Sequence, residues 1–245
     1  MIGKLTLVTF NAEDIVSLAD FYAKLAGWKL RFVEEGWITL ATDDGWRIGL
    51  EAVPHHVRPR WPDPAYPQQG HFDLRVRDLN GATERAIELG ATRLGGDGMW
   101  HTLADPAGHP FDLCRSANEA DMTIHAITID APNASALGAF YAELLGLPVS
   151  YEGDDGVLLG GDLDRRVMIQ QVQGPYAPPR WPDPAYPQQC HLDVTVGDLD
   201  EAEPRALAAG ATRLSAGGPY WRVFADPAGH PFCLLVKPEE DRGYY

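Results

Sequence analysis

The sequence predicts an α+β protein built from four copies of one unit, in which a strand and a helix are followed by three further strands. The first observation behind this prediction is an internal duplication: residues 60–69 (RWPDPAYPQQ) return unchanged as residues 180–189, 120 residues later. A period of 120 residues is far too long for a solenoid repeat, so each half of the chain is a domain. The second observation is that strand and helix patterns occur twice, in the same order, within each half.

The first unit begins with a β-rich run at residues 5–10. Apolar residues at helical spacing then predict a helix over residues 15–25, with Asn11 or Asp14 as its cap and Gly27 just past its end. Short β-rich runs follow, separated by Glu-Gly and Asp-Asp-Gly sequences that are typical of hairpin turns. The three predicted strands are residues 28–33, 37–41 and 46–53.

The second unit follows a proline-rich connection, residues 54–69, which is too long and stiff for a hairpin. It repeats the order of the first unit. A helix is predicted at residues 80–89, and the strands are predicted at residues 71–76, 92–94, 100–103 and 110–114. A polar linker at residues 116–121 ends this half, which we predict to be a domain of residues 1–115.

The second half replays the first and is predicted to be a domain of residues 122–237. It begins with a strand at residues 123–130 and a helix at residues 135–145. Its strands continue to Val172, and after the second proline-rich connection the last unit starts at His191. Residues 237–245 are polar and are expected to form a loose tail.

Composition limits the partners and the compartment. The 245 residues carry a formal charge of −15, which disfavours binding to nucleic acid and to anionic membranes. Three cysteines without CxxC spacing form no disulfide framework and indicate a reducing compartment. No apolar run approaches the roughly 18 residues of a membrane span, and the N-terminus has a strand pattern rather than a signal peptide. We therefore expect a cytoplasmic protein whose partner is a small molecule.

Several motifs resemble a known family. They are Phe21-Tyr22 before Gly27-Trp28, Phe140-Tyr141 before Gly146, and the DPAGHPF sequences at residues 105–111 and 226–232. Together with the unit order, they are similar to the vicinal-oxygen-chelate superfamily, which includes glyoxalase I, extradiol dioxygenases, fosfomycin-resistance enzymes and bleomycin-binding proteins. The WPDPAYPQQ stretch, followed by His and Asp, is similar to its glyoxalase-like subgroup.

The resemblance implies that two units curl into a half-barrel and that a divalent metal is held by the first and last strands of each unit. Carried over by position, the first-strand residues are Thr6, His71, His125 and His191. The last-strand residues are Glu51, Asp112, Gln171 and Cys233, with Gln170 as a one-residue alternative to Gln171. Imidazole, carboxylate and amide groups suit zinc, iron, nickel or manganese. Asp112 is one carbon shorter than the family's usual glutamate.

Which four residues meet depends on how the units pair. Pairing of neighbours gives the sets Thr6/Glu51/His71/Asp112 and His125/Gln171/His191/Cys233. Crossed pairing gives the sets His71/Asp112/His125/Gln171 and Thr6/Glu51/His191/Cys233. Only the crossed arrangement joins two imidazoles, a carboxylate and an amide in one set. We therefore expect crossed pairing, with one competent metal site and one degraded site that keeps Glu51 and His191 as substrate-binding residues.

Two functions follow from the resemblance. The first is a metal-assisted enzyme of the lyase, isomerase or dioxygenase type, acting on a small oxygen-rich molecule with Asp112 as catalytic base. The second is a metal-free protein that binds an antibiotic or metabolite in an aromatic pocket. The fused halves permit a monomer, and a homodimer stays open. His109 and His230 are expected to be structural turn residues, and Trp181 is expected to anchor its connection by packing.

Overall fold

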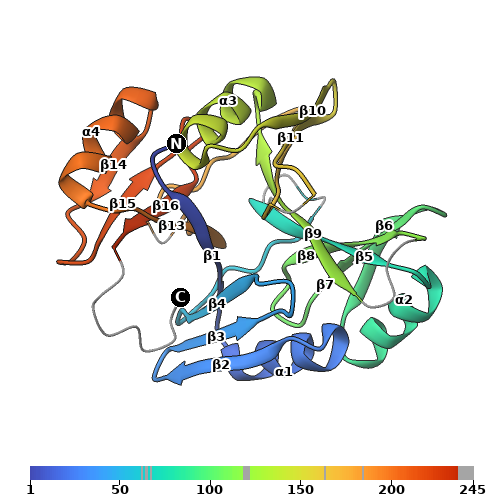
Figure 1. Cartoon of the computed structure of the whole chain (residues 1–245). Coiled ribbons are helices and arrows are strands. Elements are labelled where there is room, and N and C mark those ends of the chain that lie inside the picture. The colour runs from blue at the N-terminus through green and yellow to red at the C-terminus, as the bar shows by residue number, and fades with distance from the viewer. Residues whose placement is uncertain are drawn as a thin grey trace.

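The computed structural model describes residues 1–61, 63, 66, 68–117, 122–162, 164–183 and 185–236. This part of the chain contains four helices and sixteen strands, and the strands form two eight-stranded sheets (Figure 1). The predicted tail, residues 237–245, and most of the predicted linker lie outside the described residues. None of the described helices is long and apolar enough to cross a membrane.

All four units have the predicted order of one strand, one helix and three strands. The first unit is β1 (Lys4–Ala12), α1 (Ile15–Ala26), β2 (Lys29–Glu34), β3 (Trp37–Ala41) and β4 (Arg47–Ala52). The second is β5 (Gly70–Val76), α2 (Leu79–Glu88), β6 (Thr92–Gly96), β7 (Trp100–Ala104) and β8 (Pro110–Arg115). The third is β9 (Thr123–Ala131), α3 (Ala134–Leu145), β10 (Val149–Gly153), β11 (Gly156–Leu159) and β12 (Val167–Gln171). The fourth is β13 (Cys190–Thr195), α4 (Leu199–Ala209), β14 (Thr212–Ser215), β15 (Trp221–Ala225) and β16 (Pro231–Leu235).

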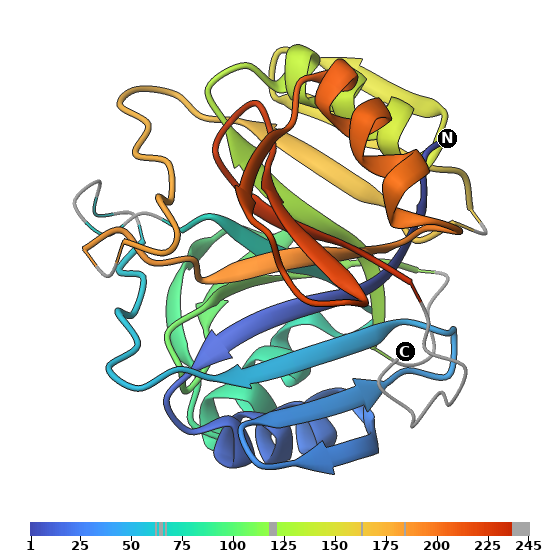
Figure 2. The same cartoon turned by 90° about the vertical axis from the view of Figure 1, so that its left-hand side faces the viewer.

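The units pair in the crossed arrangement. Sheet A has the strand order β14-β15-β16-β13-β1-β4-β3-β2 and joins the first unit to the fourth. Sheet B has the order β10-β11-β12-β9-β5-β8-β7-β6 and joins the second unit to the third. Antiparallel pairs, β1 with β13 and β5 with β9, make the two junctions. In Figure 2 the blue strand β1 lies beside the orange strand β13, although they are far apart in the sequence.

The helices begin and end where the sequence supplies caps. Of the two candidate caps of α1, the structure uses Asp14, whose carboxylate accepts the backbone N–H of Ser17 at 2.9 Å. Gly27 ends the helix with φ 69°, a left-handed conformation that is strained for residues with a Cβ. The third unit repeats this with Asn133 and Gly146.

Strand alternation separates a core face from an open face in each sheet. In β1, Val8 and Phe10 belong to the hydrophobic core, whereas Thr9 points to the other face and bonds Asp193. The ring centroids of Phe10 in sheet A and Phe72 in sheet B are 5.1 Å apart. The two sheets therefore share one core, and the face of each sheet turned away from that core, here called the open face, carries the polar residues.

A buried contact formed by the DPAGHPF turn ties the second unit to the first. The Tyr22 hydroxyl of α1 donates to Asp105 Oδ2 at 3.0 Å, and Asp105 Oδ1 accepts the backbone N–H groups of Ala107 and His109. The His109 ring donates from Nε2 to the Asn11 carbonyl at 2.8 Å. Because the first unit is in sheet A and the second in sheet B, this contact fastens the two sheets together.

The second half forms the same contact. Tyr141 donates to Asp226 at 2.8 Å, and His230 Nε2 lies 2.7 Å from the carbonyl oxygen of Asp130. The expected turn role of His109 and His230 is thus a link between units. Burial raises the pKa of Asp105 to about 7 and lowers the pKa of His109 to about 4, so the His109 ring is neutral at pH 7 and Asp105 is protonated more readily than an ordinary aspartate.

We predict that Tyr22→Phe lowers the free energy of unfolding by about 1–3 kcal/mol, because a buried carboxyl oxygen loses its donor. Tyr151→Phe is the matched control, since its hydroxyl meets Asp155 at the surface. We expect the control to change stability by less than about 0.5 kcal/mol. Urea unfolding of both variants measures the difference, and equal losses would contradict the role given to Tyr22.

A second prediction concerns acid sensitivity. The folded-state pKa of His109, about 4, lies below the ordinary value of 6.5, so its contribution to stability is complete above pH 6.5 and is lost as the pH falls towards 4. Between pH 7 and pH 4, His109→Gln should therefore lose less stability than the wild type, by on the order of 3 kcal/mol. Urea unfolding at both pH values tests this, with exposed His55→Gln as the control. Identical pH dependence of wild type and His109→Gln would refute it.

Candidate functional site

Three polar side chains meet on the open face of sheet B. His71 and Asp73 are two residues apart on β5 and so share a face, while Asp112 of β8 is the register partner of Asp73. His71 Nε2 lies 3.6 Å from Asp73 Oδ1 and 3.9 Å from Asp112 Oδ2. Only 5, 16 and 19% of these side chains, in that order, is exposed. We call these three residues the His71 cluster.

Charge and hydrogen bonding explain the protonation of the His71 cluster. Burial disfavours a charged His71, but the hydrogen bond and charge of Asp73 outweigh it and raise the pKa of His71 to about 9. Burial acts against ionisation of Asp73 too, yet contact with His71 and the Thr128 hydroxyl, 2.6 Å away, lowers the pKa of Asp73. Burial raises the pKa of Asp112. The His71 cluster therefore holds one imidazole beside two carboxyl groups whose pKa values are shifted in opposite directions.

The geometry of the His71 cluster fits a divalent cation. One ligand atom from each residue lies within 4.8 Å of the others. Two atoms bound to zinc at their usual bond lengths are about 3.0–3.4 Å apart, so a contraction of a few tenths of an ångström would close the observed 3.6 and 3.9 Å. His71 Nδ1 and Asp112 Oδ1 are buried and have no protein partner among the described residues. A cation held between the three residues would bind Nε2, the ring nitrogen that faces both carboxylates, so the unpartnered Nδ1 is not the nitrogen that would hold it.

The glutamine that faces the His71 cluster is Gln170, and not Gln171. Gln170 pairs with Asp130 across the strands, as Glu51 pairs with Asn11, and its side chain donates to Asp130 at 3.3 Å. Gln171 points to the core face. Its amide oxygen accepts the N–H of Ala134 at 2.9 Å and its amide nitrogen donates to the carbonyl of Pro132. The expectation for Gln171 fails because strand alternation sends neighbouring side chains to opposite faces.

His125 also lies away from this cluster. The register of β9 shifts beside it, between Ala126 and Ile124, so its ring points towards two arginines. Its Nδ1 is 3.1 Å from Arg166 Nη1, and its Nε2 is 3.5 Å from Arg75 Nη2. A cation at His125 would meet two guanidinium groups. Of the four predicted metal ligands, the structure brings His71 and Asp112 together and separates His125 and Gln171 from them.

Sheet A carries a matching set, here called the His191 cluster. His191 and Asp193 lie on β13, 3.7 Å apart between Nε2 and Oδ1, and Cys233 of β16 is the register partner of Asp193. The Thr9 hydroxyl donates to Asp193 at 2.9 Å. Burial raises the pKa of the Cys233 thiol well above its usual range. Among the residues that the structure describes, the buried Nδ1 of His191 has no hydrogen-bond partner, as in the His71 cluster.

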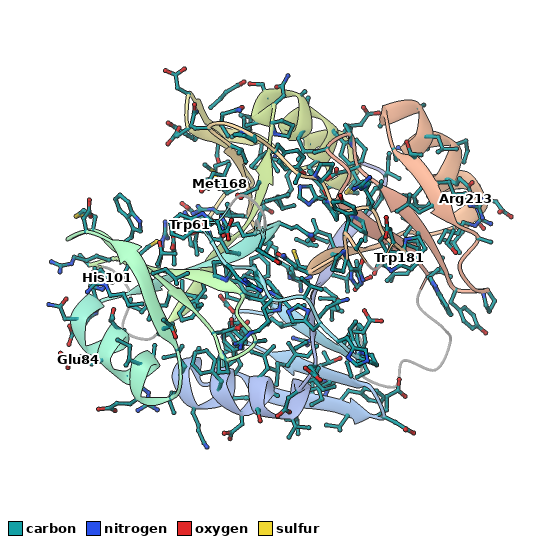
Figure 3. All side chains as sticks on the ribbon, turned by 180° about the vertical axis from the view of Figure 1, so that it is seen from behind. Trp61, Glu84, His101, Met168, Trp181 and Arg213 are labelled. Atoms are coloured by element: carbon teal, nitrogen blue, oxygen red, sulfur yellow. The ribbon has the colours of Figure 1, made fainter. Side chains whose placement is uncertain are left out.

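A cavity of about 700 Å³ opens beside the His191 cluster. It contains Glu51 and His191, the two predicted substrate-binding residues, so the structure places both at one cavity. Its aromatic lining comes from Trp37, Trp181, Tyr220 and Trp221. Trp181, expected to be a packing anchor, thus borders the cavity, and Figure 3 shows it beside the fourth unit. Thr6 is not part of the lining and instead hydrogen-bonds Thr195 at 2.5 Å.

Two residues near the His71 cluster were not identified from the sequence. Asp130 is buried on the open face of β9, where it accepts hydrogen bonds from Gln68 and Gln170 at 3.3 Å each. Gln68 precedes His71 by three residues, and its copy Gln188 precedes His191 in the same way. That repeated spacing was a usable signal. The position of Asp130 could not be read in the same way because its counterpart is Asn11.

The model of a glyoxalase-like domain matches the chain twice, at residues 7–114 and 126–235. The chain belongs to the glyoxalase-like domain family. This glyoxalase-like protein is similar in fold to glyoxalase I from Zea mays, with 15% identity, a TM-score of 0.67 and coverage of 95% of this chain and 92% of that one. A putative dioxygenase from Bacillus subtilis gives 13% identity, a TM-score of 0.61 and coverage of 96 and 85%. Among curated protein sequences, none matches significantly.

These similarities confirm a tandem vicinal-oxygen-chelate fold of two half-barrels. At such low sequence identity, the similarity to solved structures is evidence for the fold alone. The two segments that match the family do not coincide with the two sheets. Each matched segment supplies one unit to sheet A and one unit to sheet B. Both open faces of this glyoxalase-like protein are therefore composed of residues from both halves of the chain.

The placement of Gln171 generates a prediction. Gln171→Ala should lower the free energy of unfolding by about 1–2 kcal/mol, because the start of α3 loses an acceptor for the Ala134 N–H. Gln173→Ala removes the same amide from an exposed position two residues on, and we expect no measurable change. Thermal or urea unfolding compares the two variants. If Gln171→Ala were as stable as the control, the structural role of Gln171 would be wrong.

Proposed function

We propose that this glyoxalase-like protein is a divalent-metal-dependent enzyme of the lyase, isomerase or dioxygenase type, acting on a small oxygen-rich molecule. The observation that carries the proposal is the pair of matched clusters, in each of which a histidine and two acidic or thiol side chains place one ligand atom each within 4.8 Å of one another. The reaction classes are proposed by analogy with glyoxalase I and a putative dioxygenase, which share the fold. The three cysteines carry no disulfide, which supports a cytoplasmic location.

In the His71 cluster, His71, Asp73 and Asp112 would hold the metal, with Gln170 as a neighbouring amide. A nitrogen and two carboxylates suit zinc, iron, nickel or manganese. A metal bound there supplies Lewis-acid polarisation of adjacent substrate oxygens. Asp73 is held in place by the hydrogen bond that its Oδ2 accepts from the Thr128 hydroxyl. Asp112, if displaced from the metal by substrate, would be the base that accepts a substrate proton.

In the His191 cluster, His191, Asp193 and Cys233 would hold a metal that tolerates a sulfur ligand, for which zinc is suited. Here the adjoining cavity of about 700 Å³ gives room for a substrate of drug size. Glu51 reaches the same cavity and is the proposed substrate-binding carboxylate. This set was expected to be degraded, and the cavity instead favours it as a second working site.

One observation favours the alternative function, a metal-free protein that binds an antibiotic or metabolite. The aromatic rings of Trp37, Trp181, Tyr220 and Trp221 give the cavity of sheet A an apolar wall. Such a wall holds a hydrophobic ligand without a metal. The two functions differ in the metal content of the purified protein.

We expect untagged protein, purified without chelator, to contain near-stoichiometric divalent metal by plasma mass spectrometry. His71→Ala should lose the metal of the His71 cluster, and His191→Ala that of the His191 cluster. The matched control is His125→Ala, which removes an imidazole that lies between two arginines, and it should keep the wild-type metal content.

Loss of metal in His125→Ala would contradict the ligand set proposed here. Protein that stays metal-free after incubation with zinc, iron, nickel and manganese would refute the enzyme proposal. The metal-free binding function would then be the remaining candidate. Quenching of the fluorescence of the cavity tryptophans by aromatic ligands would test it.

A further inference from the structure

The cavity beside the His191 cluster combines aromatic rings with negative charge. Its lining comes from β2, β3 and β4 at one end of sheet A and from β14 and β15 at the other, so the sheet curls around it. Its acidic residues are Glu34, Glu51 and Asp193, and the lining described by the structure contains no lysine or arginine. A ligand whose charge complements this lining is therefore a cation.

Glu51 is the carboxylate that remains for such a ligand. Asp193 accepts the Thr9 hydroxyl at 2.9 Å and lies 3.7 Å from His191 Nε2, so it is the group that balances a protonated His191. Glu34 has another interaction partner and is not needed. Glu51 makes no hydrogen bond or ion pair with any residue that the structure describes. Its negative charge is therefore available to a bound cation.

Two tryptophan rings of the lining lie against glycines. A Cβ added at Gly218 would be 2.5 Å from carbons of the Trp221 ring, and a Cβ added at Gly49 would be 2.9 Å from Cζ2 of Trp37. A side chain at either glycine would thus displace the ring. Trp221 is 45% exposed, so a ligand can reach it. The face of an indole attracts a cation that comes within about 6 Å of the ring centroid.

The carboxylate and one of these rings are neighbours. Glu51 on β4 and Trp37 on β3 are register partners, so their side chains lie on the same face of the sheet. A positively charged group placed there meets a carboxylate and an aromatic ring together. Charge-assisted hydrogen bonds to the first and attraction by the second act on the same ammonium group.

The matching place in sheet B has neither group. Gly156 pairs with Gln170 there, as Trp37 pairs with Glu51 in sheet A. The carboxylate is thus replaced by an amide and the indole by a residue without a side chain. Because both sheets have the same strand order, the fold itself does not require Glu51 or Trp37. The acidic and aromatic pair is specific to the cavity of sheet A.

We propose that the cavity of sheet A binds an organic cation, an ammonium group attached to an aromatic or other apolar body. Glu51 would accept the ammonium N–H groups, Trp37 and Trp221 would contact the cation and the body, and the volume of about 700 Å³ admits both parts. This inference rests on the proposed use of the cavity as a ligand site and names its ligand class. It applies to an enzyme and to a metal-free binding protein alike.

The test compares three probes of similar size and different charge, titrated into the full chain at low ionic strength and pH 7.5. They are the 2-phenylethylammonium ion, neutral 2-phenylethanol and anionic phenylacetate. Calorimetry gives each affinity. We expect saturable binding of the ammonium ion, roughly tenfold tighter than that of the alcohol, and no measurable binding of phenylacetate.

Glu51→Gln should reduce the preference for the ammonium ion over the alcohol to below about threefold and leave the affinity for the alcohol unchanged. A loss of cavity structure would instead weaken both probes. The matched control is Glu88→Gln, which removes the same charge from an exposed position of α2 outside the lining and should keep the wild-type preference. The inference is overturned if the ammonium ion binds no more tightly than the alcohol, or if Glu51→Gln keeps the full preference.

The metal content of each sample, measured before and after chelator treatment, separates this inference from the enzyme proposal. Metal-free protein that still prefers the ammonium ion would support the cation site while counting against a metal-dependent enzyme. Metal-loaded protein without that preference would overturn the cation site and leave the enzyme proposal standing.

Discussion

The structure depends on the buried tyrosine–aspartate contact that each half of the chain makes once, between Tyr22 and Asp105 and between Tyr141 and Asp226. Each contact fixes a unit of one sheet against a unit of the other. Because the two contacting units belong to different sheets, their central strands stay available for pairing. Each central strand pairs with a strand from the other half of the chain, β1 with β13 and β5 with β9. Neither half forms a complete eight-stranded sheet by itself.

Crossed pairing decides which side chains can work together. The junction of β5 with β9 puts Thr128 of the second half beside Asp73 of the first, and the junction of β1 with β13 puts Thr9 beside Asp193. In both places a threonine hydroxyl holds the aspartate that follows a histidine by two residues. The two clusters are thus assembled by the same backbone geometry from different halves of the chain.

Duplication has left one scaffold with two chemically different open faces. Asp112 in sheet B corresponds to Cys233 in sheet A, and Gln170 corresponds to Glu51. Sheet A adds an aromatic cavity, while a cavity beside sheet B is lined by arginines and His125. The Asp112-containing set and the thiol-containing set beside an aromatic cavity show that the two open faces differ in chemistry.

The sequence by itself determined the four units and their order, because periodicity and turn chemistry are local properties. It also singled out His71 and Asp112, which the structure brings together, and favoured crossed over neighbouring pairing of the units. Only the tertiary structure decided that pairing, since it rests on contacts between residues far apart in the sequence, such as Asp73 with Thr128, 55 positions away, and Thr9 with Asp193, 184 positions away. The tertiary structure also decided which way individual strand side chains point. Because neighbouring strand residues point to opposite faces, Gln171 lies on the core face of sheet B, where it bonds the start of α3. The bulge beside Ala126 points His125 towards the arginines.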